Sequence, residues 1–517
     1  MRQVAHIFRK DFERLWLLCA LVAVETILHA FYLTKLGGMT GLFVMGPLGI
    51  IGLFAVLSAL VLPVVVAVMT VVVIQAEPLT GSDAFWLTRP YSRAALLTEK
   101  AAFVALFGLA PLALHDVFAV AWFGLASPAA LPVITMETIE FTMVLLPVAA
   151  SAVLTPGFGR FAIAGVSMLF SFGLLLSVLG ARMEANWGLL ASIPGMIEWP
   201  LAAATAVAMV VYQYRTRRTK YSVAMGVAGL VAIALVLALF RFTFAWGFHD
   251  RLEPPAPGLE QVRVVPTFDA SNAVLSERGP QKHLLAYPFR VDGLSDGISI
   301  QEFRTDSAVN SAPLAVLNAP EFRNHTSAFL LFAGGDDFQV RNRNTLVDWR
   351  GAIYFQAYRD LPKIRVPVSD KEVEVTISRE KCKVTSRLNY PGNFILSLDC
   401  AELEPASGLR IEAVLEDAGG QAIWGNSTGQ SGLGQDGHAL FPAMMNPVHL
   451  SKIGVDLRRV DGQNPATIPA DATVVISPKE PAGLIRRDFH ISGVRLADLE
   501  YESWKLRGTA NFPQAVH

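Results

Sequence analysis

The sequence predicts an α-helical transmembrane bundle of about seven spans, followed by an all-β, sandwich-like extracytoplasmic domain. Three observations support this fold class. Residues 1–250 hold 15 Lys and Arg and 12 Asp and Glu, against 28 and 32 in residues 251–517. The first half contains apolar runs long enough to cross a bilayer. The second half contains short alternating runs between turn residues.

Residues 1–14 are expected to form an amphipathic helix on the cytoplasmic face of the membrane. The apolar side chains fall near one face of this helix, and the charged ones lie mostly on the other. The alternative is that these residues extend the first spanning helix into the cytoplasm. No cleavage site follows the first apolar run, so this run is expected to remain as an anchor. The apolar set is Val4, Ile7, Phe8, Phe12 and Leu15.

Residues 15–246 are expected to form the transmembrane domain. Each of its seven apolar segments can cover the ~30 Å hydrocarbon core, for which about 20 helical residues suffice. Turn-like breaks such as KLGGMTG, SPAALP and TPGFGR separate the segments. The segments are residues 15–34, 48–75, 101–126, 131–154, 161–180, 188–213 and 221–246.

The cations between the segments predict the orientation, because cytoplasmic loops are enriched in Lys and Arg. With the N-terminus inside, twelve cations lie on inner segments and three lie on outer ones. An odd number of spans then places residues 247–517 outside the cytoplasm. We therefore expect a multi-pass protein of the cell (inner) membrane with a cytoplasmic N-terminus. The inner cations are Arg2, Arg9, Lys10, Arg14, Arg89, Arg93, Lys100, Arg160, Arg215, Arg217, Arg218 and Lys220; the outer ones are Lys35, Arg182 and Arg241.

The inner loop at residues 77–100 is long and contains several conformational signals. Pro78 and Pro90 each interrupt a helix, and the motif GSD at 81–83 makes a turn with a helix N-cap. A short amphipathic helix between these breaks presents the aromatic pair at 85–86 to a cytoplasmic partner or to the lipid headgroups. An ordinary interfacial aromatic anchor is the alternative.

The basic amphipathic start IFRKDFERLW, the two spans and the loop with FWLTRPYSR and LLTEK together resemble the membrane subunit, or permease, of type-2 ABC transporters. The resemblance covers about residues 1–215, six spans with both ends inside. It implies that residues 77–100 hold the coupling helix, which docks on a separate cytoplasmic ATPase. The seventh span and the external domain are additions to the family pattern, and they leave the substrate open. The resemblance assigns the ATPase contact to Asp83, Phe85, Trp86, Arg89 and Arg93, with Glu77 at the membrane edge.

The chain is not expected to be an enzyme by itself. A phosphate-binding loop requires GxxxxGK[ST], and the sequence contains no Gly-Lys dipeptide. No cofactor is therefore expected to bind directly, and ATP with magnesium belongs on the partner subunit. The motif GxSxG at 425–429 is followed by the flexible-loop sequence QSGLGQDG, so it does not predict a catalytic serine. The sequence also lacks HExxH, and we predict no metal site.

Six ionisable residues lie within the apolar segments, between the middle of the membrane and its outer leaflet. A carboxylate at this depth costs about 2.5–3.5 kcal/mol on insertion scales, so such groups normally face protein or water. One hypothesis is a polar lining of a translocation path. The second is hydrogen bonding between helices, and proton coupling is a third. The residues are Glu25, His29, His115, Asp116, Glu137 and Glu140.

Residues 247–517 are expected to form the β-rich domain. Alternating or β-branched runs such as EVEVTI, FILSLDC and ATVVIS recur at spacings typical of β-sandwiches. The length allows two modules meeting near residues 360–368, and only SAPLAVLNAP at 311–320 is typical of a short helix. Cys382 and Cys400 flank the turn NYPGN symmetrically, so a regular hairpin would bring them within disulfide distance. The alternative is two unrelated cysteines on strands, because a bulge would break this register.

Three functions are compatible with these features. The leading hypothesis is a permease subunit of an ATP-driven exporter, which pairs with itself or with a sibling permease, contacts membrane lipid and binds a separate ATPase. The alternatives are a non-transporting anchor for an extracytoplasmic binding or sensor domain, and a tethered external enzyme. A single span would be sufficient for either alternative, so seven spans favour the permease. The net charge is only −1 and the chain has no long basic tract, which argues against a nucleic-acid partner.

Overall fold

The computed structural model describes the helices and most strands of the chain, and every structural statement below concerns these residues. The described residues are 2–36, 47–76, 92–163, 165, 193–239, 246–247, 249, 251, 258–266, 284–309, 312–316, 321–322, 327–333, 344–369, 371–389, 393–403, 409–426, 447–459, 471–495 and 497.

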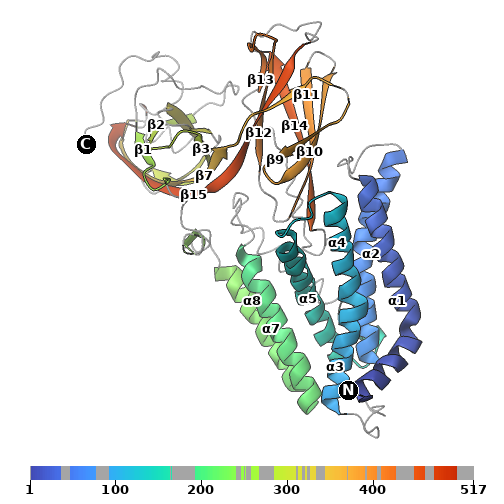
Figure 1. The fold of residues 1–517 in the computed structure, drawn as a ribbon. Coiled ribbons are helices and arrows are strands. Elements are labelled where there is room, and N and C mark those ends of the chain that lie inside the picture. Colours follow the sequence, from blue (N-terminus) through green and yellow to red (C-terminus); the bar gives the residue numbers. More distant parts are fainter. Residues whose placement is uncertain are drawn as a thin grey trace.

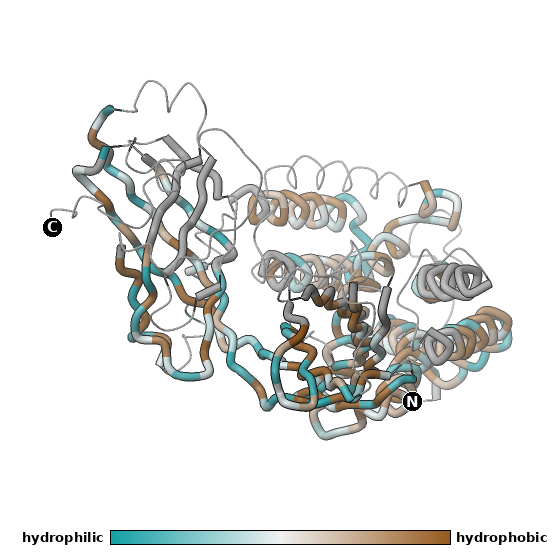
Figure 2. Tube along the Cα trace, turned by 90° about the horizontal axis from the view of Figure 1, so that it is seen from above, coloured by the Kyte–Doolittle hydropathy of each residue, from teal (hydrophilic) through white to brown (hydrophobic). Residues whose placement is uncertain are grey.

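The first half forms a bundle of long helices, with the N-terminus at the end far from the β-rich part (Figure 1). Four helical stretches are long and apolar enough to cross a membrane: Gln3–Phe31, Arg93–Trp122, Ala130–Leu154 and Thr219–Val236. Figure 2 shows the helices as predominantly hydrophobic, whereas the strands alternate in hydropathy. The chain is thus helical first and β-rich afterwards, as predicted. The helices are α1 (Arg2–Leu36), α2 (Pro47–Gln75), α3 (Arg93–Val104), the π-helix η2 (Ala105–Leu109), α4 (Ala110–Trp122), α5 (Ala130–Leu154), α7 (Ile193–Thr216) and α8 (Thr219–Leu239).

These helices correspond to six of the seven expected segments, and most of the segment 161–180 lies outside the described residues. The total of seven spans therefore stays a prediction. Residues 2–14 continue directly into the first apolar segment as one helix, α1, which is the geometry of the second alternative for the N-terminal segment. Ile7 in this part of α1 and Leu15 directly after it are buried, and both lie on the expected apolar face.

Helices α1 and α3–α4 run parallel, because successive contacts between them advance along both chains. Phe8 contacts Phe103, Phe12 contacts Phe107, and the rings of His29 and His115 are 4.8 Å apart. The π-turn η2 lies between α3 and α4, directly before Pro111. Proline has no N–H to donate and clashes with the carbonyl four residues earlier, so the widened turn accommodates it.

The second half is a continuous antiparallel sheet of 15 strands that folds around two hydrophobic cores. The main strand order is β1-β2-β6-β4-β3-β7-β15-β12-β13-β14-β11-β10-β9, with β5 on β3 and β8 on β15. The strands are β1 (Arg263–Pro266), β2 (Leu284–Asp292), β3 (Ile298–Val309), β4 (Ala312–Val316), β5 (Glu321–Phe322), β6 (Ser327–Ala333), β7 (Leu346–Asp360), β8 (Ile364–Pro367), β9 (Val373–Ile377), β10 (Glu380–Asn389), β11 (Asn393–Leu403), β12 (Arg410–Glu416), β13 (Ala422–Asn426), β14 (Val448–Arg459) and β15 (Thr473–Arg495).

The first core lies between two layers, β1-β2-β6-β4 and β3-β7-β15, and we call this part the first module. Phe289 of β2 contacts Phe355 of β7 across it, with ring centroids 6.4 Å apart. The second core, within the second module, is built from β8 to β14 and the start of β15. Along the chain after β3, core residues belong to the first core up to Ala357 and to the second core from Val366 to Ile476. Strand β15 belongs to both modules, because it pairs with β12 at its start and with β7 afterwards.

One expected element is wrong. The stretch SAPLAVLNAP contains a strand, β4, instead of a short helix. Its Ala312–Val316 segment bonds to β3 on one side and to β6 on the other, so tertiary pairing overrides the local helical preference of Ala and Leu.

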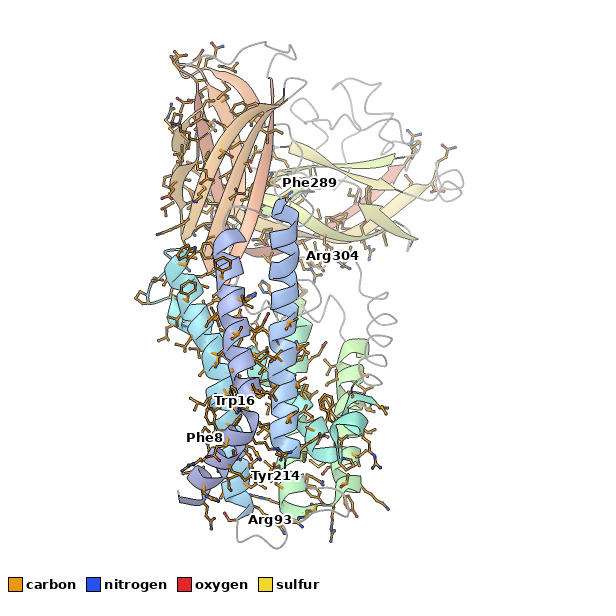
Figure 3. All side chains as sticks on the ribbon, turned by 90° about the vertical axis from the view of Figure 1, so that its right-hand side faces the viewer. Phe8, Trp16, Arg93, Tyr214, Phe289 and Arg304 are labelled. Carbon is orange, nitrogen blue, oxygen red and sulfur yellow. A yellow bond between two sulfur atoms is a disulfide. The ribbon has the colours of Figure 1, made fainter. Side chains whose placement is uncertain are left out.

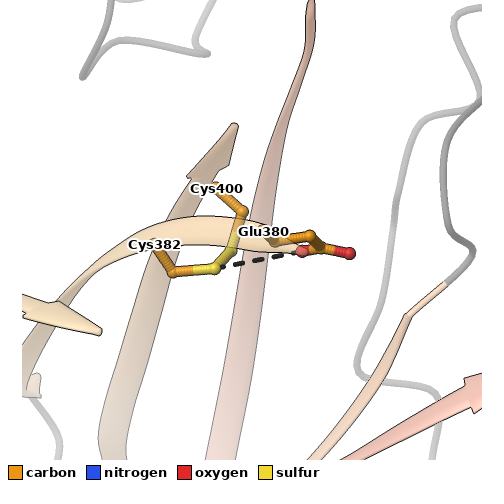
Figure 4. The surroundings of a disulfide bond; sticks show 3 residues. All are labelled: Glu380, Cys382 and Cys400. Atoms are coloured by element: carbon orange, nitrogen blue, oxygen red, sulfur yellow. Dashed lines mark hydrogen bonds between the residues drawn. A yellow bond between two sulfur atoms is a disulfide. The ribbon is translucent and has the colours of Figure 1, made fainter. Parts of the chain in front are cut away.

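The expected disulfide is confirmed. Cys382 and Cys400 are paired residues of β10 and β11 and are joined by a bond (Figure 4). The register between the strands runs without a bulge from Lys381 to Asn389, so the symmetric spacing around the turn is retained in the fold.

The helical bundle and the second module share a small apolar contact. The turn between α4 and α5 places Leu125 and Ala130 against Ala401 of β11 and Val448 of β14. Gly124 in this turn has φ +66°, and a Cβ there would lie 2.6 Å from Lys381 Nζ. Ala401 is adjacent to Cys400, so the disulfide constrains the β10–β11 hairpin that contacts the α4–α5 turn.

Candidate functional site

The end of the bundle that carries the N-terminus holds the described part of the expected coupling region. Helix α3 begins at Arg93, where the Ser92 hydroxyl accepts a hydrogen bond from the Ala95 amide at 3.1 Å. Serine is a preferred N-cap because it satisfies an amide that has no partner within the helix. Helix α3 therefore has a capped start directly after residues 77–91 of the expected coupling loop, which lie outside the described residues.

A buried charged cluster joins α1 to α3 two turns after this cap. Lys100 forms an ion pair with Asp11 of α1, and Lys100 Nζ lies 3.3 Å from the Glu99 carboxylate. All three side chains are buried: Asp11 and Glu99 are 0% exposed and Lys100 is 3% exposed. Because charges inside an apolar bundle are strongly disfavoured unless paired, this cluster fixes the relative position of α1 and α3.

Aromatic side chains continue this contact toward the middle of the bundle. Phe8 lies 5.4 Å from Phe103 and 5.8 Å from Phe107, and Phe12 lies 5.3 Å from Phe107, measured between ring centroids. Phe107 belongs to the π-turn η2, whose Gly108 packs closely against α2: a Cβ there would meet Val66 at 3.1 Å. The ion cluster and the rings together bind α1 to α3 and η2 along about two turns.

Arg93 is the one expected coupling residue that lies among the described residues. Its guanidinium donates a hydrogen bond to the Arg215 carbonyl in the last turn of α7. Burial, and then the charge of the nearby Arg93, lowers the pKa of the Arg217 guanidinium. Arg93 thus connects the start of α3 to the end of α7 (Figure 3). Glu77, Asp83, Phe85, Trp86 and Arg89 lie outside the described residues.

A second polar cluster lies nearer the opposite end of the same helices. His115 Nδ1 is 3.1 Å from Asp116 Oδ1, and the His115 ring faces His29 of α1. His115 and Asp116 are 3% and 0% exposed. Within the described part of the chain, His29 Nδ1, His115 Nε2 and Asp116 Oδ2 have no hydrogen-bond partner. Three of the six expected intramembrane residues are therefore brought together.

The other three residues lie elsewhere along α1 and on α5. Glu25 is half-buried on α1, one turn before His29, and Glu137 and Glu140 are half-buried on α5. Asp11 and His29 are 18 residues apart on α1, or about 27 Å at ~1.5 Å per residue. The two polar clusters are thus separated by nearly the thickness of a hydrocarbon core, ~30 Å.

Sequence reasoning missed the Asp11–Glu99–Lys100 cluster. The signal was present: Asp11 lies four residues from both Ile7 and Leu15, so it interrupts the apolar stripe of α1. An acid on a buried stripe predicts a cation on the facing helix.

The arrangement does not contain a convincing metal site among the described residues. The Glu380, Cys382 and Cys400 side chains have ligand atoms within 4.8 Å of one another, and Cys382 Sγ is 3.9 Å from Glu380 (Figure 4). Metal binding by cysteine requires the thiolate, and both sulfurs are consumed by the disulfide.

Comparison of the chain with models of known protein families, with characterised proteins and with solved structures finds no significant match.

Proposed function

We propose that the chain is the permease subunit of an ATP-driven ABC transporter that exports its substrate. In this proposal the N-terminus is cytoplasmic, seven helices cross the inner membrane, and two copies or two sibling permeases pair. A separate ATPase docks on the loop 77–100 and binds ATP with magnesium, and this chain is not itself an enzyme. The β modules lie on the far side of the membrane.

The observation that carries the proposal is the sequence motif at 77–100 together with the contacts that hold helix α3, which begins within this region. The sequence of this loop resembles the coupling region of type-2 ABC permeases, and helix α3 at its downstream end is held by three contacts. The Ser92 cap fixes its start, Arg93 connects it to α7, and Lys100 connects it to α1. A displacement of the loop is therefore transmitted to α1 and α7, instead of being lost in a flexible joint.

The long helix α3-η2-α4 supplies the path across the bundle. It runs from the buried ion cluster to the His115–Asp116 pair and ends at the turn that contacts Ala401 and Val448. In the proposed cycle, closure of the ATPase dimer moves the loop, α3-η2-α4 shifts relative to α2, and the β modules follow. In this proposal the π-turn η2 is the point at which the helix adjusts, because single π-turns inside α-helices are frequent at functional sites.

The proposal is tested by purifying the tagged full-length protein in mild detergent from its native cells and identifying bound proteins by mass spectrometry. We expect an ABC ATPase that disappears from the preparation when Phe85, Trp86 and Arg89 are replaced together by alanine. The matched control replaces Arg218, an exposed cation between α7 and α8, and Tyr221, an exposed aromatic in the first turn of α8; both lie outside the region of resemblance.

Retention of the ATPase in the control and its loss in the loop variant supports docking at this loop. A preparation without any ATPase, even after chemical cross-linking, contradicts the permease function. That outcome favours the second candidate, a membrane-anchored extracytoplasmic binding or sensor protein, for which changes in 77–100 are tolerated.

A further inference from the structure

The outer face of the β3-β7-β15 layer in the first module has an unusual composition. The register places Arg304, Tyr354 and Arg486 side by side in one row, and Asp306, Ala352 and Asp488 in the next. Alternate residues point to opposite faces of a sheet, so the intervening Ile353, Trp349 and Phe489 enter the core. The polar residues therefore occupy the face turned away from the core, which we call the charged face.

On this face, each arginine forms an ion pair with an aspartate two residues away in the same strand. Arg304 bonds to Asp306 at 2.7 Å, Arg350 to Asp348 at 2.9 Å and Arg486 to Asp488 at 2.9 Å. Three arginines and three aspartates thus balance each other on this face, and His490 lies 2.6 Å from Asp348. The Arg350, Arg486 and Asp488 side chains are 69%, 44% and 72% exposed, so most of these charges remain accessible.

The charged face starts where the last membrane helix ends. Trp246, seven residues after α8, contacts Tyr354 at the centre of the face with ring centroids 4.8 Å apart. The Arg486 guanidinium lies 5.8 Å from the same Tyr354 ring. Trp246 is only 7% exposed, so its ring packs against the face. The contact therefore joins the face to the segment that directly follows the candidate span Thr219–Val236.

Figures 1 and 3 agree on which way this layer is turned. The β7 and β15 strands form the side of the first module that lies nearer the helices, and Arg304 lies on that side, whereas Phe289 lies within the module. Arg290 and Asp292 of β2 form an equivalent pair, at 2.9 Å, on the opposite outer surface. The module thus has two faces with the same kind of ion pair, of which one is turned toward the helices.

We propose that the charged face rests on zwitterionic phospholipid headgroups of the membrane that the helices cross. A headgroup of this class offers a phosphate, which matches the fork of an arginine, and an ammonium, which matches an aspartate. Exposed ion pairs contribute only about 0–1 kcal/mol, so an Arg–Asp pair can exchange partners with a headgroup at little expense. The equal numbers of both charges match a neutral headgroup better than an anionic one.

This inference depends on the membrane helices and not on the transport function. If it holds, the three ion pairs keep the first module flat against the bilayer, and Trp246 joins the module to the segment after α8. The second module is then the part free to follow the α4–α5 turn.

The test uses the full-length protein in nanodiscs of phosphatidylcholine that carry a nitroxide on the headgroup. Cys19 is replaced by serine, the disulfide is retained, and a fluorophore is attached either to D488C or to D292C. Each substitution removes the aspartate of one Arg–Asp pair, so the two labels are matched. We expect strong quenching at position 488 and little at position 292.

The quenching pattern decides the proposal. Equal quenching at both positions, or no quenching at position 488, overturns the proposal. If quenching at 488 is absent and energy transfer occurs between labels on two copies, the face binds a second copy of this chain instead. Replacing Arg304 and Arg350 by glutamine should reduce quenching at 488, whereas R290Q should not. Stronger quenching in purely anionic lipid than in phosphatidylcholine overturns the zwitterionic class. None of these readouts depends on an ATPase, so failure here leaves the proposed function standing.

Discussion

Asp11 of α1 and Lys100 of α3 form an ion pair in which neither side chain reaches solvent. Glu99 lies beside the same ammonium, at 3.3 Å, and Lys10 Nζ lies 3.8 Å from the other oxygen of Asp11. Replacing both partners of a buried ion pair by apolar groups is often harmless, but removing one partner leaves an uncompensated charge. The cluster therefore positions α3 because its members depend on each other.

The first prediction concerns the asymmetry of this cluster. Lys100→Met should destabilise the protein by about 3–5 kcal/mol, because it removes the buried cation that pairs with Asp11 and lies beside Glu99. Asp11→Asn should be milder, since the Lys100–Glu99 contact remains. Thermal unfolding followed by size-exclusion chromatography in detergent measures both. Glu13→Gln, which breaks the exposed Arg9–Glu13 pair, is the control and should change stability by less than about 1 kcal/mol. An effect of Asp11→Asn larger than that of Lys100→Met contradicts the account.

The second prediction concerns the disulfide. In intact membranes without reductant, a maleimide polymer should label only Cys19, and only after denaturation, because the other two of the three cysteines are bonded. Removing the bond with C382S and C400S should lower stability by about 2–4 kcal/mol. Disulfides persist in oxidising compartments, so the same assay examines the extracytoplasmic placement of the β modules. Labelling of three cysteines without reduction would contradict that placement.

The third prediction concerns the His115–Asp116 pair. Asp116→Asn keeps an oxygen that accepts from His115 and should leave stability almost unchanged. Asp116→Leu removes the acceptor and should cost about 1–2 kcal/mol, because a polar group in an apolar environment then loses its partner. Leu114→Ala, at a position 68% exposed on the same helix, is the control. If Asn and Leu at position 116 behave alike, the pair does not hold the helices together, and the lining hypothesis gains support.

The order of helices and strands follows from the sequence, because hydrophobic periodicity reports burial directly. The disulfide was also predictable, since the symmetric spacing of Cys382 and Cys400 about one turn determines the register of a regular hairpin. Strand β4 was not, because Ala312–Val316 has helical preference and becomes a strand only through its neighbours β3 and β6. Such long-range pairing is invisible in a local window of sequence.

The candidate site was predictable in part. Of the intramembrane residues, His29, His115 and Asp116 come together because α1 and α4 run parallel, which no local pattern states. Lys100 was interpreted as a loop cation, since its partner is 89 positions away in the sequence. The charged face of the first module forms because the strand register brings its pairs together, although the spacing of Arg and Asp two residues apart can be read in the sequence.

The fourth prediction concerns the turn between α4 and α5. Gly124→Ala should destabilise the protein by about 1–2 kcal/mol, because φ +66° is unfavourable for any residue with a Cβ. The neighbouring Lys381 side chain is flexible and can move aside, so adding Lys381→Ala should not restore stability. Gly157→Ala, where a Cβ meets no atom within 4 Å, is the control. Full rescue by Lys381→Ala would show that side-chain crowding, and not the backbone, is the limiting factor.

The fifth prediction is a pH dependence at the charged face. Hydrogen bonds from Arg350 and then from His490, the latter at 2.6 Å, hold the pKa of the Asp348 carboxyl below its ordinary value. A depressed pKa gives stability that is fully present above the unfolded value of ~3.9 and is lost as pH falls through the folded value. Wild type should therefore lose its advantage over D348N between about pH 5 and about pH 3. Because these groups are exposed, the effect should be small and should shrink in high salt. A stability difference between wild type and D348N that stays constant over this range, measured by thermal unfolding, would assign the role of Asp348 to packing instead of charge.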